Sequence, residues 1–316
     1  MVGCLLVRRL ALLALCAGTA LAQVDTGAIS GVVTDESGAV IPGAQVTVTQ
    51  LDTNVQVALS TNTAGFYSAP ALHPGRYGVT VSKNGFQAQK RTGLDLRVQD
   101  RLELNFKLAL GATTTEITVT AAPTVLESET SSLGQVIEEK TITDLPLNGR
   151  SFIQLATLTA GTLPSTRTPE RDNFISNGAR AVQNSYLLDG IDNKNRIMGF
   201  DKSSAQIIQP VIDAIEEFKV QTSTFSAEFG QAAGGVVNVT MKSGTNQFHG
   251  NLFEFLRNSA LDATPYFQPS GRAKPLFIQN QFGATFGGPI LKDRTFFFGS
   301  WQSSREENSA PQTASV

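Results

Sequence analysis

The strongest restriction on the fold comes from an alternation of apolar and polar residues between Arg101 and Leu108. Leu102, Leu104 and Phe106 occupy every second position, and the residues between them are charged or carry an amide. A repeat of two residues is the period of a β-strand with one buried and one solvated face. This part of the chain is therefore predicted to be a half-buried strand.

Six further short runs with strand-like composition precede it, and turn sequences such as Pro74-Gly75 and Asn84-Gly85 separate them. About seven short strands in one small segment favour a β-sandwich, which we place at residues 27–110. The predicted strands are Ile29–Thr34, Ala44–Gln50, Val55–Ser60, Gly65–Ala69, Arg76–Ser82, Leu94–Val98 and Arg101–Leu108.

The first 22 residues have the features of a cleaved secretory leader. Arg8 and Arg9 supply positive charge, Leu10–Ala17 is apolar, and Ala20-Leu21-Ala22 is a small-x-small cleavage site. The apolar run is shorter than the ~20 residues that span a bilayer. The chain is predicted to be exported and to begin at Gln23 after processing.

The composition excludes several classes of protein. Both cysteines, Cys4 and Cys16, lie inside the leader, so the processed chain would need a sizeable core or a membrane for its stability. The 25 basic and 27 acidic residues nearly balance and form no Lys/Arg cluster, which argues against a nucleic-acid partner. No later stretch of 18 apolar residues exists, which excludes a helical membrane span.

No catalytic or metal-binding motif is visible. The chain has only two histidines, His73 and His249, and neither belongs to a zinc-binding pattern. Nucleophile elbows and phosphate-binding glycine loops are missing as well. Asp189 and Asp192 form one carboxylate pair, but Gly190 between them favours a turn. We predict a protein that is not an enzyme and that has no cofactor or metal.

Residues 27–110 also contain five short sequence motifs in a fixed order. They are Gly31-Val-Val-Thr-Asp-Glu-Ser-Gly38, Ile41-Pro-Gly-Ala44, Thr63-Ala-Gly-Phe-Tyr67, Pro74-Gly-Arg-Tyr77 and Asn84-Gly-Phe86. Together they resemble the carboxypeptidase-regulatory-like domain, a transthyretin-like sandwich that is often grouped with carbohydrate-binding-like folds. The resemblance implies a fold and not an activity, because such sandwiches are appended to many proteins.

A second series of sequence motifs occupies residues 124–244. They are Leu133-Gly-Gln-Val-Ile137, Leu145-Pro-Leu-Asn-Gly-Arg150, Ser176-Asn-Gly-Ala-Arg180, Tyr186-Leu-Leu-Asp-Gly-Ile-Asp-Asn193 and Ile212-Asp-Ala-Ile-Glu-Glu-Phe-Lys-Val220. In this order they resemble the plug domain of TonB-dependent outer-membrane transporters that carry such an N-terminal sandwich, the Oar-like subset. The residues read as alternating short helices and strands, an α+β unit. One helix is predicted at Ile207–Glu217, with an interruption at Pro210.

The stretch Phe225–Asn258 resembles the junction at which such a plug passes into the first barrel strand. Glycine at this place would supply freedom in φ and close approach of the backbone. An ordinary hairpin of a soluble β-protein is the alternative. The resemblance implies a structural junction role for Gly230, Gly234, Gly235, Asn238 and Gly244.

Residues 111–123 are predicted to be a linker of small residues and threonines that ends at Pro123. Inside it lies a segment rich in β-branched residues, which is predicted to be extended and is of the kind that pairs with a partner's sheet edge. Its position before the plug-like residues resembles the TonB box, whereas a plain threonine-rich linker is the alternative. The box-like residues are Thr115, Glu116, Ile117, Thr118, Val119, Thr120 and Ala121.

Residues 245–316 are predicted to begin an outer-membrane β-barrel. Half of the Phe, Tyr and Trp residues of the chain fall between Phe248 and Trp301, as in strands that face lipid. Phe282 and Phe286 alternate with polar or small residues. A plugged transporter barrel has ~22 strands of ~10 residues, whereas the residues after Gln247 suffice for about three. The sequence thus predicts the N-terminal part of a longer transporter.

Two functions from different classes follow from these patterns. The first is an outer-membrane receptor for active uptake, with its N-terminal sandwich in the periplasm of a Gram-negative-type bacterium. Its partners would be a TonB-like energy transducer, outer-membrane lipid and a small ligand, glycan or peptide. The second is a periplasmic or surface interaction protein, carbohydrate-binding-like and without transport activity. The ligand-selecting loops of a barrel are mostly absent from these residues, so the ligand stays open.

Overall fold

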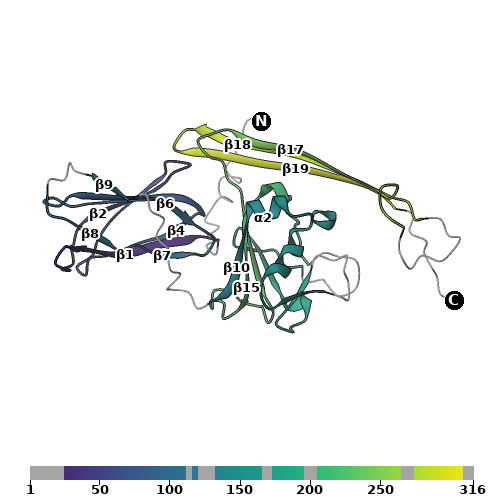
Figure 1. The fold of residues 1–316 in the computed structure, drawn as a ribbon, viewed down its shortest axis with the longest axis horizontal. Helices are drawn as coiled ribbons and strands as arrows, with labels where there is room; N and C mark the ends of the chain where they lie inside the picture. Colours follow the sequence, from purple (N-terminus) through teal and green to yellow (C-terminus); the bar gives the residue numbers. More distant parts are fainter. Residues whose placement is uncertain are drawn as a thin grey trace, which may run out of the picture.

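The computed structural model describes residues 25–111, 116–119, 132–165, 173–195, 205–264 and 274–308. The predicted leader and most of the predicted linker lie outside these residues. The described chain is mainly β-structure, as the sequence predicted. It forms a sandwich at the N-terminus, a mixed unit in the middle, and a long three-stranded sheet that runs along the mixed unit and extends beyond it, with its other end near the sandwich (Figure 1).

Two sheets form the sandwich. One sheet has the order β4-β1-β7, with β8 also paired to β1, and the other has the order β3-β2-β5-β6-β9. The strands are β1 (Gly27–Asp35), β2 (Gln45–Gln50), β3 (Gln56–Ser60), β4 (Phe66–Leu72), β5 (Gly75–Ser82), β6 (Ala88–Leu96), β7 (Arg101–Glu103), β8 (Phe106–Leu108) and β9 (Glu116–Val119).

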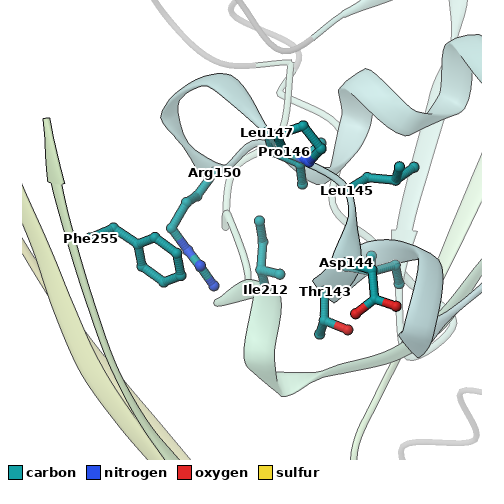
Figure 2. A pocket seen from close by; sticks show the side chains of 9 residues that line it. Thr143, Asp144, Leu145, Pro146, Leu147, Arg150, Ile212 and Phe255 are labelled. Atoms are coloured by element: carbon teal, nitrogen blue, oxygen red, sulfur yellow. The ribbon is translucent and has the colours of Figure 1, made fainter.

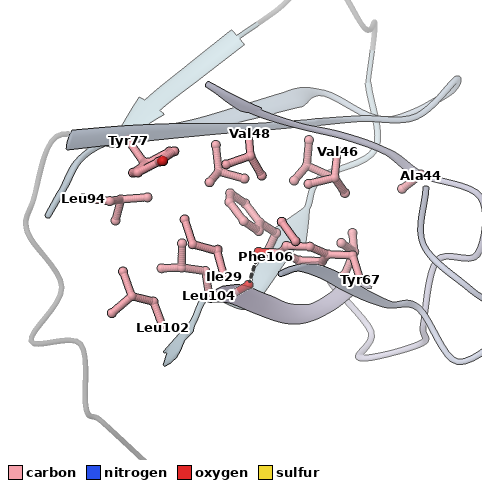
Figure 3. Packing of buried hydrophobic residues seen from close by; sticks show 14 of the residues in the cluster. Ile29, Ala44, Val46, Val48, Tyr67, Tyr77, Leu94, Leu102, Leu104 and Phe106 are labelled. Carbon is pink, nitrogen blue, oxygen red and sulfur yellow. Dashed lines mark hydrogen bonds between the residues drawn. The ribbon is translucent and has the colours of Figure 1, made fainter. Parts of the chain in front are cut away.

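Apolar side chains from both sheets meet between them (Figure 3). Ile29 of β1 and Val46 and Val79 of the opposite sheet are fully buried. Tyr67 lies in the same core, and its hydroxyl donates a hydrogen bond of 2.8 Å to the carbonyl oxygen of Leu104. Because that hydroxyl has a partner, the aromatic ring is buried without an unsatisfied polar atom.

The alternating run Arg101–Leu108 is divided into two strands. Its four apolar side chains are buried as the alternation predicted, but β7 ends at Glu103 and β8 begins at Phe106. At the break the Leu104 amide donates to the carbonyl oxygen of Ser30, at 2.7 Å, and the Asn105 side-chain oxygen accepts the Val32 amide, at 2.8 Å. A side chain thus replaces one backbone group of the ladder.

The middle unit, which we call the plug-like unit, spans residues 132–241. Its five-stranded sheet has the order β10-β15-β16-β13-β14, and a two-stranded sheet, β11-β12, lies beside its short helices. The elements are β10 (Leu133–Glu138), α2 (Glu139–Asp144), η1 (Asn148–Arg150), η2 (Phe152–Leu158), β11 (Thr162–Pro164), β12 (Phe174–Ser176), η3 (Ala181–Gln183), β13 (Ser185–Leu188), β14 (Ile191–Asp192), η4 (Ile212–Ala214), β15 (Ile215–Ser223) and β16 (Val236–Met241).

The helix predicted at Ile207–Glu217 is wrong. Only the single turn η4 is helical there, and Ile215 already begins β15. Strand β15 pairs on one side with β10 and on the other with β16. Its central place in the sheet supplies hydrogen-bond partners on both edges, and this tertiary pairing outweighs the local helix signal. The predicted turn at Asp189 is present, because Asp189 and Gly190 both have positive φ between β13 and β14.

The last sheet consists of β17 (His249–Asn258), β18 (Phe277–Leu291) and β19 (Thr295–Asn308) in an antiparallel meander. Its two faces differ in polarity. Gln281 and Thr285 of β18 are buried, whereas Leu252, Phe286 and Trp301 are exposed. The polar residues thus lie inside and the apolar residues outside, which is the alternation of an outer-membrane strand.

Candidate partner-binding segment and plug junction

The box-like segment is present in the structure as strand β9. Residues Glu116 to Val119 form it, while Thr115, Thr120 and Ala121 lie outside the described residues. It pairs in parallel with β6, where Ala88 is opposite Glu116 and Arg91 is opposite Val119. The segment therefore lies at the edge of the sandwich as a strand.

The chain is fixed to the same edge just before β9. The Gln87 amide donates to the carbonyl oxygen of Ala109 at 2.9 Å, and the Gly111 amide donates to that of Gly85 at 3.1 Å. A β-bridge joins Phe86 and Leu110 between these bonds. The predicted linker thus begins as backbone that is bonded to the sandwich.

Gly234 and Gly235 approach the rest of the plug-like unit closely. A Cβ atom on Gly234 would collide with the side-chain oxygen of Asn184, and one on Gly235 would lie 3.2 Å from the Phe174 ring. Asn184 is fully buried, and its side chain accepts the Gly235 amide at 2.9 Å and donates to the Phe174 carbonyl at 2.7 Å. Asn184 therefore holds three segments together, a role that no pattern in the sequence indicates.

The expectation of unusual φ at these glycines is wrong. None of Gly230, Gly234, Gly235 and Gly244 has positive φ. Close packing is the reason for glycine at three of them, since a Cβ on Gly244 would collide with the carbonyl oxygen of Phe297 in β19. Gly230 has open space around it, and nothing in the structure explains its glycine. Asn238 is buried in β16, where it lies between β15 and β13.

A buried ion pair connects the plug-like unit with the first strand of the long sheet. The guanidinium of Arg150 binds the carboxylate of Asp213, and both side chains are nearly buried. The other oxygen of Asp213 accepts a hydrogen bond of 2.7 Å from the side chain of Asn251 in β17. The same guanidinium lies over two rings of β17, 3.9 Å from the centre of Phe255 and 4.9 Å from that of Phe253.

Local backbone geometry places Arg150 in this position. Gly149 and Arg150 both have positive φ, so the backbone turns sharply inside η1, at the residue whose side chain binds Asp213. Burial lowers the pKa of the Arg150 guanidinium, and the nearby Asp213 carboxylate opposes that effect. Arg150 and Asp213 lie in two of the sequence motifs that resemble a plug domain, but no periodicity or spacing indicated that they pair.

Arg150 also borders a pocket of about 620 Å³ between the plug-like unit and β17 (Figure 2). Ile142, Leu147 and Ile212 give it an apolar lining on one side, and Phe255 bounds it on the other. Arg150 points between Phe255 and Ile212. The pocket is therefore part of the junction between the plug-like unit and the first strand of the long sheet.

The sandwich contacts the plug-like unit through a loop that follows β6. The Val98 amide donates to the carboxylate of Glu217 on β15. The ammonium of Lys219, two residues further along β15, lies 3.5 Å from a carboxylate oxygen of Asp100. At the rim, Arg97 and Glu138 form an ion pair of 2.7 Å. The buried polar face of β15 is thus the docking face for the sandwich.

Burial makes Glu217 titrate unusually. Removal from water raises the pKa of its carboxyl to about 7, and the negative charges of Asp100 and Glu216 add to this effect. The hydrogen bond from Val98 and the charge of Arg97 act in the opposite direction. A carboxyl group at this interface therefore changes its charge near neutral pH.

The residues that the structure describes contain neither a cluster of metal-binding side chains nor a helix that could span a membrane. Among them, no three His, Cys, Asp or Glu side chains gather in a group that could hold a metal ion. No helix in the same part of the chain is long and apolar enough to cross a membrane.

Comparison with known families identifies the two ends of the chain. Residues 28–109 match the carboxypeptidase regulatory-like domain, and residues 240–316 match an outer membrane beta barrel domain. The chain therefore joins a regulatory-like sandwich to strands of an outer-membrane barrel, and it is an outer-membrane protein.

A relative of known class covers most of the chain. The TonB-dependent transporter Oar of Myxococcus xanthus is 29% identical over 278 residues, which amount to 82% of this chain and 25% of that protein. This chain is homologous to that transporter and spans about a quarter of its length. The relative is a transporter and not an enzyme.

Solved structures of outer-membrane receptors show partial likeness. The siderophore receptor PirA of Acinetobacter baumannii is 22% identical with a TM-score of 0.40, and the match covers 57% of this chain and 25% of PirA. The outer membrane transporter YddB of Escherichia coli is 15% identical with a TM-score of 0.45, and the match covers 55% of this chain and 26% of YddB.

Proposed function

We propose that this chain belongs to an outer-membrane receptor that takes up its ligand actively, with energy from a TonB-like partner in the periplasm. The partner binds residues 115–121, and the plug-like unit and the long sheet belong to the transport path. The observation that carries the proposal is strand β9, which follows the sandwich and precedes the plug-like unit along the chain and forms the edge strand of a sandwich sheet. Homology to a TonB-dependent transporter supports it.

Strand β9 has the property that such a partner requires. Recognition by strand addition uses main-chain hydrogen bonds, and alternate side chains tune its specificity. Residues Glu116 to Val119 already form a ladder of this kind with β6. The segment is thus compatible with an extended, paired conformation.

Proline substitutions in the complete receptor test the proposal. Because proline removes an amide donor and fixes φ, Ile117→Pro or Val119→Pro should reduce energy-dependent uptake by about tenfold or more while ligand binding persists. Alanine at the same positions should have a much smaller effect, since the backbone ladder survives. Thr113→Pro, in the same linker but outside residues 115–121, is the matched control. Normal uptake by both proline variants would exclude this segment as the site of the energy-transducing contact.

A further inference from the structure

Strand β9 uses only one of its two edges. In the order β3-β2-β5-β6-β9 it stands at the end of the sheet, and among the described strands it pairs with β6 alone. The backbone N–H and C=O groups of a strand point to both sides, so the outer side of β9 offers an unpaired row. An open edge of this kind is a template for a further strand.

We infer that the sandwich presents residues 116–119 as a preformed edge strand, and that the periplasmic partner extends this sheet by pairing with the outer edge of β9. The partner would then bind without removing β9 from β6. This inference rests on the proposed function and specifies how that same segment is recognised. The matching surface on the partner is an open sheet edge of its own.

The contacts around β9 favour presentation over displacement. Residues 88–92 of β6 are half-buried, so removal of β9 would expose them as well as their backbone groups. The bonds of Gly85 and Gln87 to residues 109–111 keep the chain at this edge. An ordered strand also has less conformational entropy to lose on binding than a free linker has.

The position of the edge relative to the plug-like unit is fixed too. The Lys219–Asp100 ion pair and the bond from Val98 to Glu217 hold the sandwich against β15. The sandwich that presents the strand therefore has a defined place against the plug-like unit, and β9 lies on the part of the sandwich that points away from that unit (Figure 1).

A reversible disulfide between β6 and β9 distinguishes presentation from displacement. Ala88 and Glu116 are opposite each other, and strands in a sheet lie ~4.8 Å apart, within the ~4.4–6.8 Å range of Cα separations in disulfides. Ala88→Cys with Glu116→Cys in the complete receptor should therefore crosslink on oxidation. Both cysteines of this sequence, Cys4 and Cys16, lie in the predicted leader, and any cysteine elsewhere in the complete receptor is first replaced by serine. The reduced form of the same protein is the reference.

The readout is the affinity of the detergent-solubilised receptor for the purified periplasmic domain of the energy-transducing partner. Presentation predicts that the oxidised receptor binds within about threefold of the reduced one, or more tightly. A larger loss on oxidation that reduction reverses would establish displacement and overturn the inference. So would failure of the disulfide to form, because the pairing of β9 with β6 would then be absent.

Two controls separate this outcome from failure of the proposed function. Gln56→Cys with Glu116→Cys places the first thiol on β3, at the opposite edge of the same sheet, and should not crosslink. If the reduced receptor does not bind the partner domain and Ile117→Pro leaves uptake unchanged, the proposed function itself fails. If the partner binds the reduced form but not the oxidised form, only the presentation of β9 fails.

Discussion

Single polar side chains hold together segments of this chain that are far apart in sequence. Asn184 joins the turn before β16 to β12, and Arg150 joins the plug-like unit to β17 through Asp213. Each replaces water by a specific partner, so a buried polar group is stabilising only while its partner is present. Substitutions at these positions should therefore have effects much larger than their change in volume suggests.

Gly234 tests the close approach to Asn184. Gly234→Ala should destabilise the plug-like unit by about 1–3 kcal/mol, because the new Cβ displaces the Asn184 side chain and leaves polar groups unpaired. Gly230→Ala is the matched control, since its Cβ would meet open space and its φ is not positive. Urea titration of the purified chain, with the resistance of the plug-like unit to proteolysis as the signal, compares the unfolding midpoints of the two variants. Equal midpoints would show that Asn184 adjusts at little cost.

Substitution of Arg150 tests how much its ion pair with Asp213 contributes to stability. Arg150→Ala should lower the free energy of unfolding of the plug-like unit by about 3 kcal/mol, because it leaves a buried carboxylate without its cation. Arg150→Lys should recover part of this loss, since it keeps the charge but not the planar stacking on Phe255.

The matched control for Arg150 is an exposed ion pair in the sandwich. Arg76 lies 2.5 Å from Asp52, and its side chain is 64% exposed. Arg76→Ala should change stability by less than about 1 kcal/mol. The same urea titration measures both variants, and a loss at Arg150 no larger than at Arg76 would mean that the Asp213 carboxylate finds other partners.

At the scale of elements, sequence patterns predict strands well where one face is buried and the other is solvated. The alternation of Leu102, Leu104, Phe106 and Leu108 identified four core side chains correctly. It could not show the break at Leu104-Asn105, because that depends on bonds to β1, about 70 residues away in sequence. Local periodicity contains no information about such a partner.

Strand β15 shows a second limit of sequence patterns. Phe218 and Val220 face the core of the plug-like unit, and Glu217 and Lys219 on the other face are buried as well. A charged side chain normally indicates a solvated face, so the sequence alone could not show that a second domain covers it. The same holds for the Arg150–Asp213 pair, whereas the extended conformation of residues 116–119 agrees with their β-branched composition, and their role as a partner-binding box stays a prediction.

At the scale of the whole molecule, hydrogen bonds connect all three parts. Asp293, in the turn between β18 and β19, accepts bonds from Asn54 of the sandwich at 2.9 Å and from Asn246 at 2.8 Å. The backbone N–H of Asn246 also donates to the carbonyl oxygen of Asp52. The sandwich therefore contacts the connection between β16 and β17 and the turn of the long sheet, in addition to its contact with β15 of the plug-like unit.

Docking of the sandwich on β15 should depend on pH. The pKa of Glu217 is about 7 in the docked form and returns toward its ordinary value of 4.5 if undocking hydrates the group. The docked form then binds the proton more tightly than the undocked form. The stabilisation of docking by this proton is therefore full below about pH 4.5, decreases as the pH rises, and is lost above about pH 7.

Hydrogen exchange of the Val98 amide measures this dependence, because that amide donates to Glu217. After correction for the intrinsic rate, its protection should fall by about tenfold or more between pH 5 and pH 8. Glu217→Gln keeps an acceptor without a titrating group and should make the protection independent of pH. A pH dependence that persists in Glu217→Gln would assign the effect to another group, of which Glu216 is the nearest with a raised pKa.

The place of β10 at the edge of its sheet has a mechanical consequence. A pull on residues 116–119 reaches the plug-like unit through the chain that enters β10, and among the strands that the structure describes β10 pairs with β15 alone. When the pull is directed across the sheet, tension at the end of an edge strand peels its hydrogen bonds one after another, because these bonds lie perpendicular to the strand. The Arg97–Glu138 pair at the far end of β10 lies where that peeling would finish. Under load, β10 should therefore separate first while β15 and β16 stay paired, which would open the plug-like unit from its edge.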